Sequence, residues 1–252
     1  MARKQMKKRR RHRRGRFAIL YKVLSMLMIC AAIVAAMILF FKVDSIQVEG
    51  NQRYESQQIV EVSGVLQGDN LFLLNKYDIS RRIYEQLPYV QQVQISRSFP
   101  SGLVIEVKEG GAAAAIEQSD GLWLLSSSGK LLEHTGLSTP LHCPKIRGVD
   151  LLMPSAGQSF ALPEEQTLAR EHLLQLVQSL EKHGMSELIK TIDLSSSIRI
   201  TLTYTDRFSV YIPWGSDMDY KVRYLATVVE RLESNERGII DLMSEAEAHF
   251  YY

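Results

Sequence analysis

The chain has 252 residues, with 30 basic and 28 acidic side chains, so its formal net charge is only +2. That balance hides a split, because residues 1–42 carry 12 of the basic side chains and none of the acidic ones, leaving the remainder with a net charge of −10. Cys30 falls in the apolar part of the N-terminal region and Cys143 stands alone beyond it, which excludes an intramolecular disulfide in the later part of the chain.

The first element is an apolar run from Val23 to Phe41 that carries no charge and is flanked by Lys22 and Lys42. As a helix it would rise about 28 Å, close to the thickness of the hydrocarbon core of a bilayer. A cleaved signal peptide has a similar basic and apolar pattern, but the run is long and ends in bulky residues where a peptidase needs small ones. We therefore expect an uncleaved transmembrane helix, whose alanines at positions 31, 32, 35 and 36 face either lipid or a partner helix.

The segment before this helix holds ten basic side chains between Arg3 and Arg16 and no acidic one. The positive-inside rule predicts that this tail is cytoplasmic and that the chain beyond the helix is exported. Basic runs also bind nucleic acid, but no aromatic side chain is interleaved with these charges, so we expect contact with anionic membrane lipid instead. The composition predicts that the tail is disordered.

The next stretch predicts the order strand, helix, helix, strand, strand. Alternating residues predict a strand over 44–49, and Ser56 is a candidate N-cap for a short helix that Gly64 or Gly68 ends. A second helix is expected to start at Asp78 and to stop before Pro88, with Ile79, Ile83, Tyr84 and Leu87 on its buried side. Strands are expected over 90–97 and from Leu103 to Val107, joined by a turn at 99–102.

This order, with Val48-Glu49-Gly50-Asn51, Gly68-Asp69-Asn70-Leu71, Leu87-Pro88-Tyr89-Val90 and the hairpin from Arg97 to Leu103, resembles a POTRA domain. Placed directly after a single basic-flanked helix, it resembles the bacterial cell-division family FtsQ/DivIB. The segment from Glu109 to Ala115 departs from the family pattern of a charged residue, a proline and a strand. The resemblance implies an α+β fold in which the POTRA domain is followed by a mixed β domain with two helices.

The rest of the chain fits that expectation. Trp123 to Leu125 and Lys130 to Leu132 read as a hairpin turning at Gly129, and a short strand is expected within 141–148. An amphipathic helix is expected over 164–183, between Pro163 and Gly184. A β-meander follows, with strands at 192–194, 198–204 and 208–212, then a helix capped by Asp217 and a last strand at 239–242. The Gly215, Lys221 and Leu225 pattern of that helix resembles the family's late helix.

No group of residues predicts catalysis or cofactor binding. His142 and Cys143, with His134 nearby, match no zinc spacing, and His172 and His183 lie about three helical turns apart. Asp241 is a single carboxylate, no glycine-rich phosphate loop is present, and no serine or cysteine has a recognisable base partner. We expect a protein that is not an enzyme and that has no metal, no cofactor, no small-molecule substrate and no nucleic-acid partner.

A binding role is expected at the C-terminal end, because an edge strand exposes backbone groups that a partner strand can pair with. In the FtsQ/DivIB family the last strands are implicated in docking FtsB/DivIC and FtsL, and the resemblance places that surface at Ile239, Ile240, Asp241, Leu242, Phe250, Tyr251 and Tyr252. The alternative is that the three aromatic residues only cap the core.

The resulting hypothesis is a single-pass scaffold of the division septum. Its parts are a basic tail (1–22), a transmembrane helix (23–41), a POTRA domain (42–110), a β domain (111–244) and a C-terminal segment (245–252). A POTRA-type chaperone or adaptor for exported proteins, or for cell-wall synthesis, is the alternative function. A chaperone would predict tandem POTRA units or a following barrel of alternating strands, and neither pattern is present in this sequence.

Overall fold

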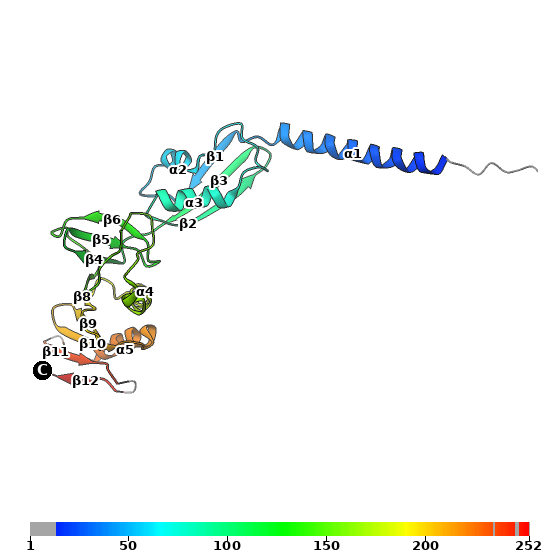
Figure 1. Cartoon of the computed structure of the whole chain (residues 1–252). Coiled ribbons are helices and arrows are strands. Elements are labelled where there is room, and N and C mark those ends of the chain that lie inside the picture. Colours follow the sequence, from blue (N-terminus) through cyan, green and yellow to red (C-terminus); the bar gives the residue numbers. More distant parts are fainter. Residues whose placement is uncertain (1–13, 234, 245–246, 252) are drawn as a thin grey trace, which may run out of the picture.

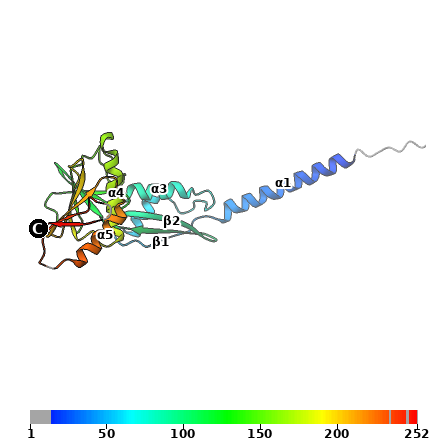
Figure 2. The same ribbon diagram turned by 90° about the horizontal axis from the view of Figure 1, so that it is seen from below.

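The structure is a computed structural model that describes residues 14–233, 235–244 and 247–251. It consists of a long N-terminal helix, a small α+β unit with a three-stranded sheet, and a larger unit built on a nine-stranded sheet. Figure 1 shows the three parts following one another, with the helix leaving the small unit on the side away from the large sheet, and Figure 2 shows the same order from another direction. The expected α+β architecture is confirmed.

Helix α1 runs from Arg14 to Phe40, and its segment Ile19–Phe40 is long and apolar enough to cross a membrane. None of that 22-residue segment is buried against protein. This candidate span begins before Val23, where the sequence predicted the start, and it includes Lys22, whose long side chain can reach the headgroup layer. Disorder was expected through Arg16, which is wrong for Arg14 to Arg16 because these residues form the first turn of α1; the earlier basic residues lie outside the described part of the chain.

The small unit has the expected order of elements: β1 (Ser45–Glu49), α2 (Ser56–Ser63), α3 (Lys76–Gln86), β2 (Val90–Ser98) and β3 (Gly102–Glu109). Strand β3 lies in the middle of the sheet, parallel to β1 and antiparallel to β2. The two helices cover one face and bury Ile59, Ile79 and Ile83 against Leu103 and Ile105. The strand residues in this core are the ones that alternate in the sequence, since every second side chain of a strand points to the same face.

Both helix starts in this unit differ from the prediction. Ser56 is the first helical residue of α2, and the N-cap is Glu55, which makes no side-chain capping bond. Helix α3 begins two residues before Asp78, because the Asn75 side chain accepts a hydrogen bond from the backbone N–H of Tyr77 at 3.1 Å and caps the helix there. Of the two glycines considered as the end of α2, Gly64 is the C-cap, with φ of 66°.

The large sheet has the strand order β12-β11-β10-β9-β8-β7-β4-β5-β6. Its strands are β4 (Ala114–Gln118), β5 (Gly121–Leu125), β6 (Leu131–Thr135), β7 (Lys145–Arg147), β8 (Ile189–Asp193), β9 (Arg199–Tyr204), β10 (Phe208–Pro213), β11 (Gly238–Asp241) and β12 (His249–Tyr251). The hairpin β5–β6 and the meander β8–β9–β10 are antiparallel as expected. Strand β8 begins three residues before the expected Ile192.

Two helices pack on the same core as the sheet. Helix α4 (Thr167–Lys182) follows the 3-10 turn η1 (Glu164–Gln166), and α5 (Met218–Arg231) begins after Asp217, whose side chain accepts from the N–H of Tyr220 at 3.0 Å. The buried stripes of the helices lie against inward-facing residues of the strands, including Leu173, Leu176, Val177, Val222, Leu225, Ile200, Leu202, Val210 and Ile240. Figure 1 shows α4 and α5 next to each other beside the later strands.

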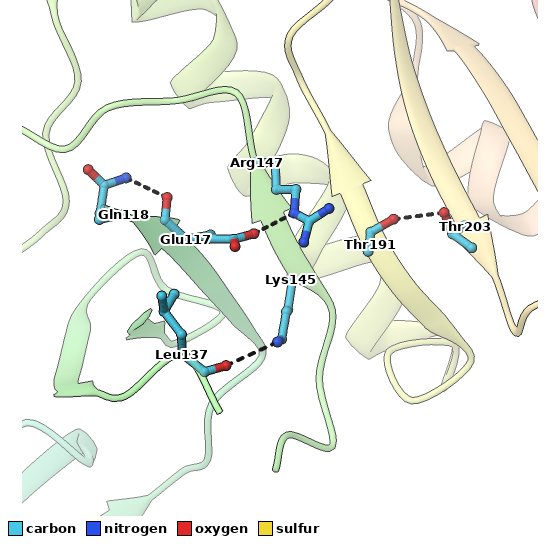
Figure 3. Close-up of polar contacts among 7 residues, drawn as sticks. All are labelled: Glu117, Gln118, Leu137, Lys145, Arg147, Thr191 and Thr203. Atoms are coloured by element: carbon cyan, nitrogen blue, oxygen red, sulfur yellow. Dashed lines mark hydrogen bonds and ion pairs between the residues drawn. The ribbon is translucent and has the colours of Figure 1, made fainter. Parts of the chain in front are cut away.

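Strand β7 has only three residues, yet it joins the two halves of the large sheet. It is parallel to β4 on one side and to β8 on the other. Figure 3 shows Arg147 of β7 reaching across to the carboxylate of Glu117 on β4, while Thr191 of β8 donates a hydrogen bond to Thr203 of β9 at 2.7 Å. The ion pair of Arg147 and Glu117 reinforces the pairing of β4 with β7, where the backbone ladder is shortest, and the threonine pair reinforces the next pairing, of β8 with β9.

The two sheets are joined through a packed junction. Lys130, in the turn before β6, is almost fully buried. Its ammonium group donates hydrogen bonds to the carbonyl oxygens of Tyr84 and Val90, the latter at 3.0 Å. The same ammonium lies 3.6 Å from the centre of the Tyr84 ring. Arg53 stacks over the ring of Tyr89 at 3.6 Å and forms an ion pair with Glu133 at 3.5 Å. The small unit is therefore fixed against the large one by polar contacts as well as apolar ones.

Candidate partner-docking edge

The C-terminal end of the chain forms one edge of the large sheet. Strand β11 runs parallel to β10, and β12 turns back antiparallel to β11, with Ile239 opposite Tyr251, Ile240 opposite Phe250 and Asp241 opposite His249. Among the described strands, β12 has a neighbour on one side only. Its other side presents backbone donors and acceptors at the sheet margin, which is the arrangement that an added strand can pair with.

The predicted site residues divide between the two faces of this edge. Ile240 and Leu242 are fully buried, and Phe250 packs on the same core with its ring 6.0 Å from that of Phe208. Ile239 and Asp241 are half-buried on the opposite face, beside Tyr251, which is 51% exposed. Tyr252 lies outside the described residues. The side chains that a partner could reach directly are therefore Ile239, Asp241 and Tyr251, while Ile240, Leu242 and Phe250 hold the strands in place.

A close backbone approach fixes β12 on β11. A Cβ atom added at Gly238 would lie 2.0 Å from the carbonyl oxygen of Tyr251, and the φ of Gly238 is 155°. Only glycine fits there without moving β12. The loop before β11 is held by Arg207, whose Nε donates to the carbonyl of Glu236 at 3.1 Å. The position of the edge strand therefore depends on residues outside the strand itself.

Lys221 of α5 is a second anchor of this edge. It is 2% exposed, and its ammonium group donates to the carbonyl oxygens of Leu242 and Ser244, each at 2.6 Å. These two residues follow β11 directly, so the lysine fixes the chain as it leaves the strand. Sequence reasoning matched Lys221 to a family pattern but assigned it no role. The available signal was its place on the apolar stripe of α5, three residues after Met218 and four before Leu225.

His134, His172 and His183 make separate local contacts. His134 faces Asp120 at 3.6 Å, His183 contacts Asp219 at 3.0 Å, and the ring of His172 meets the carbonyl of Leu168 at 2.7 Å. Within the described residues, no three side chains of the histidine, cysteine, aspartate and glutamate types are grouped as a metal site. Burial raises the pKa of the Cys143 thiol to about 11, which keeps it protonated and a poor nucleophile at neutral pH.

Two family models match this chain and together cover most of it. Residues 41–109 match the POTRA domain of FtsQ type, and residues 114–243 match the C-terminal domain of the cell division protein FtsQ/DivIB. The chain belongs to the FtsQ/DivIB family of cell division proteins. The second match ends just beyond β11, so it includes Ile239 to Leu242 of the edge and leaves β12 outside.

Individual relatives in the FtsQ/DivIB family agree with this assignment. The chain is 28% identical to the cell division protein FtsQ of Corynebacterium glutamicum over 216 residues, which cover 85% of this chain and 90% of that protein. It is 31% identical to FtsQ of Syntrophotalea carbinolica, over 80% of this chain and 70% of the relative. It is 25% identical to the cell division protein DivIB of Clostridium botulinum, over 84% and 82%. The helix α1 indicates that this family member is a single-pass membrane protein.

Proposed function

We propose that the chain is a non-catalytic scaffold of the division septum, which captures FtsL and the FtsB/DivIC-type bitopic proteins at the edge formed by β11 and β12. The exposed margin of β12 is the observation that carries this proposal. Strand addition would extend the large sheet by one strand, and the adjacent side chains of Ile239 and Tyr251 would contact the side chains of the incoming strand.

The same proposal includes the topology. The basic N-terminal tail would stay in the cytoplasm, because positive charge next to a membrane span is retained on that side. The two α+β units would then lie outside the membrane, with a net charge of −10 from residue 43 onward. The tail would contact anionic lipid at the inner surface of the membrane.

The exposed face of the edge gives the sharpest test. Ile239→Arg places a charge next to Tyr251 without entering the core, because Ile239 is only half-buried. We expect it to weaken capture of FtsL and FtsB/DivIC by at least about tenfold, the loss expected when a charge is desolvated in the centre of an interface. The measurement is co-purification, from detergent, of the full chain with its tagged partners.

Ile198→Arg is the matched control, because Ile198 is 70% exposed and lies in the loop before β9 instead of at the edge. Both variants should keep the near-ultraviolet circular dichroism spectrum of the unchanged protein. Equal partner capture by the two variants would show that the docking surface lies elsewhere. Deletion of residues 245–252 is the second arm, and it should abolish capture while the remaining chain stays folded.

A further inference from the structure

The connection between α1 and the small unit is short and is fixed by backbone hydrogen bonds. Immediately after the helix, the backbone of residues 41–44 is bonded into the small unit. The carbonyl of Phe41 accepts from the N–H of Leu71 at 2.9 Å, the N–H of Val43 donates to Asp69 at 2.7 Å, and the N–H of Asp44 donates to Ser101 at 2.9 Å. A linker bonded in this way cannot act as a flexible tether. The small unit therefore has a fixed position relative to the end of the membrane span.

Asn70 ties the end of α1 itself to the same loop. Its side-chain amide donates to the carbonyl oxygens of Met37 and Ile38, each at 3.1 Å. Both carbonyls belong to the last turn of the helix, where carbonyl oxygens lack a complete set of intrahelical donors, and the carbonyl of Met37 also accepts from the N–H of Phe41 at 3.3 Å. Lys42 and Asn70 also form an isolated antiparallel bridge. The loop between α2 and α3 thus acts as the C-terminal cap of the transmembrane helix.

Large apolar side chains gather at this end of the small unit. The rings of Phe41, Phe72 and Phe99 form a cluster with centroid separations of 5.1, 5.7 and 5.8 Å. Phe99 is 59% exposed, and Leu73, which follows Phe72 in the chain, is 76% exposed. We call Phe41, Phe72, Leu73 and Phe99 the juxtamembrane patch. Leu66 and Tyr77, in and beside the same loop, are also largely exposed.

The patch is held rigidly. The Nε of Arg97 donates to the carbonyl of Leu71 at 2.6 Å, and its guanidinium lies 5.8 Å from the centre of the Phe72 ring. Arg97 thereby connects the hairpin β2–β3, which carries Phe99, to the loop that carries Phe72. Apolar residues fixed at the tips of two loops and left exposed mark a binding surface.

The position of the juxtamembrane patch relative to the bilayer indicates what covers it. The span Ile19–Phe40 rises about 33 Å, which matches the roughly 30 Å hydrocarbon core, so Phe41 stands at the boundary between acyl chains and headgroups. Phe72 and Phe99 touch Phe41 and therefore lie at the same depth. Aromatic side chains are favoured at this boundary. Figures 1 and 2 show the small unit meeting the C-terminal end of α1, and Phe41 follows that end directly in the chain.

We propose that the juxtamembrane patch is seated in the interfacial layer of the bilayer, so that the small unit is docked on the membrane surface through lipid contacts. A basic tail and a membrane span do not by themselves require such docking. A single helix could also anchor a folded unit through a flexible linker. The occupant is lipid, since the patch continues directly from the lipid-facing surface of α1. Docking would fix the height and direction at which the whole exported part leaves the membrane.

The first test uses the full chain in nanodiscs that hold one copy each, so that neither a second copy nor a partner can cover the patch. Leu73→Trp reports contact with lipids that are brominated near the headgroup end of the acyl chains. We expect these lipids to reduce the added tryptophan emission by about half relative to unbrominated lipid, as for an interfacial tryptophan. Trp123 and Trp214 give the background, which the unsubstituted chain measures.

Ile198→Trp is the matched control, because Ile198 is 70% exposed but lies in the large unit. Its emission should not respond to bromination. Equal responses at positions 73 and 198 would overturn the proposal. Because a new tryptophan can itself seek the interface, a second measurement uses the unsubstituted chain with a photoactivatable phosphatidylcholine. Crosslinks should fall within residues 66–77 and 98–101 and not at 196–199, and their absence from the first two segments would also overturn it.

Discussion

Two almost fully buried lysines connect separate elements of this chain. Each does so by donating hydrogen bonds to backbone carbonyl oxygens. Lys221 fixes the exit from β11, and Lys130 fixes the small unit to the large one. Each ammonium group donates to backbone carbonyl oxygens, and that of Lys130 also lies over an aromatic ring. Removal of either lysine would leave carbonyl oxygens without their donor.

The role of Lys221 can be tested with Lys221→Met, which keeps the length and the apolar stem of the side chain. The carbonyl oxygens of Leu242 and Ser244 would lose their donor, and we expect the free energy of unfolding to fall by about 1–3 kcal/mol. Thermal unfolding of the full chain in detergent, followed by near-ultraviolet circular dichroism, measures the change. The control is Lys182→Met, because Lys182 is exposed on α4 and an exposed ion pair contributes little. Equal effects of the two substitutions would refute the anchoring role.

Lys130 predicts a dependence of stability on pH. Burial lowers the pKa of its ammonium group from an ordinary 10.5 to about 8, so the unfolded chain binds this proton more readily than the folded chain between these values. The free energy of unfolding that this group contributes should therefore rise as the pH increases from about 8 to about 10.5, by at most about 3 kcal/mol. The difference in unfolding free energy between the unchanged chain and Lys130→Met isolates this term from other titrating groups.

The matched substitution is Lys190→Met, because Lys190 is exposed on β8. Its difference from the unchanged chain should stay flat over the same pH range. A Lys130→Met difference that also stays flat, or that falls with pH, would contradict the burial of the ammonium group.

At the scale of single elements, the pairing of β12 with β11 depends on the space at Gly238. Gly238→Ala would push a Cβ atom into the carbonyl of Tyr251, so we expect the backbone amides of 249–251 to exchange hydrogen at least about tenfold faster, because a strand that loses its ladder opens locally. Hydrogen–deuterium exchange with mass spectrometry measures this. Gly111→Ala is the control, since nothing lies within 4 Å of a Cβ atom there. Unchanged protection of 249–251 in Gly238→Ala would show that β12 is not held by this contact.

The elements that the sequence predicted well are those whose burial has a simple period. Strand β9 alternates through Ile200, Leu202 and Tyr204, and α5 places Val222 and Leu225 on one stripe, so both could be located from the pattern. Strand β4 could not, because its alanines are buried on both faces in the interior of the sheet and leave no alternation to detect. The start of α3 differed because the hydrogen bond to the Asn75 side chain, and not the hydrophobic pattern, sets it, whereas Glu55 at the start of α2 makes no side-chain capping bond.

The place of the candidate site in the chain could be predicted from the sequence. Which of its side chains face outward could not. The strand expected over 239–242 exists but is shifted by one residue, because β11 runs from Gly238 to Asp241, and β12 after it forms the sheet margin among the described strands. Which side chains face outward depends on the register with β12, and the contacts made by Lys130 and Lys221 join residues far apart in the chain. Such contacts follow from tertiary packing, which no local pattern records.

At the scale of the whole molecule, the fixed joints at both ends of the small unit make a continuous connection from α1 to the candidate docking edge. The linker after α1 is bonded into the small unit, and the far end of α3 is held to the large unit by Lys130. The edge formed by β11 and β12 lies at the opposite end of the molecule from α1 (Figure 1). A rigid connection of this kind would present the edge at a constant distance from the membrane, where bitopic partners with their own spans could meet it.

That rigidity predicts a narrow distribution of distances between the two units. Nitroxide labels at Leu73→Cys and Ile198→Cys, in a chain with Cys30→Ala and Cys143→Ala, would report it by pulsed electron spin resonance in detergent. We expect one narrow peak, and a broader distribution when Lys130→Met and Arg53→Ala remove the polar contacts of the junction. The exposed Lys190→Met and Arg81→Ala serve as controls and should leave the peak unchanged. A broad distribution in the otherwise unchanged chain would show that the units move independently, and the edge would then have no fixed height above the membrane.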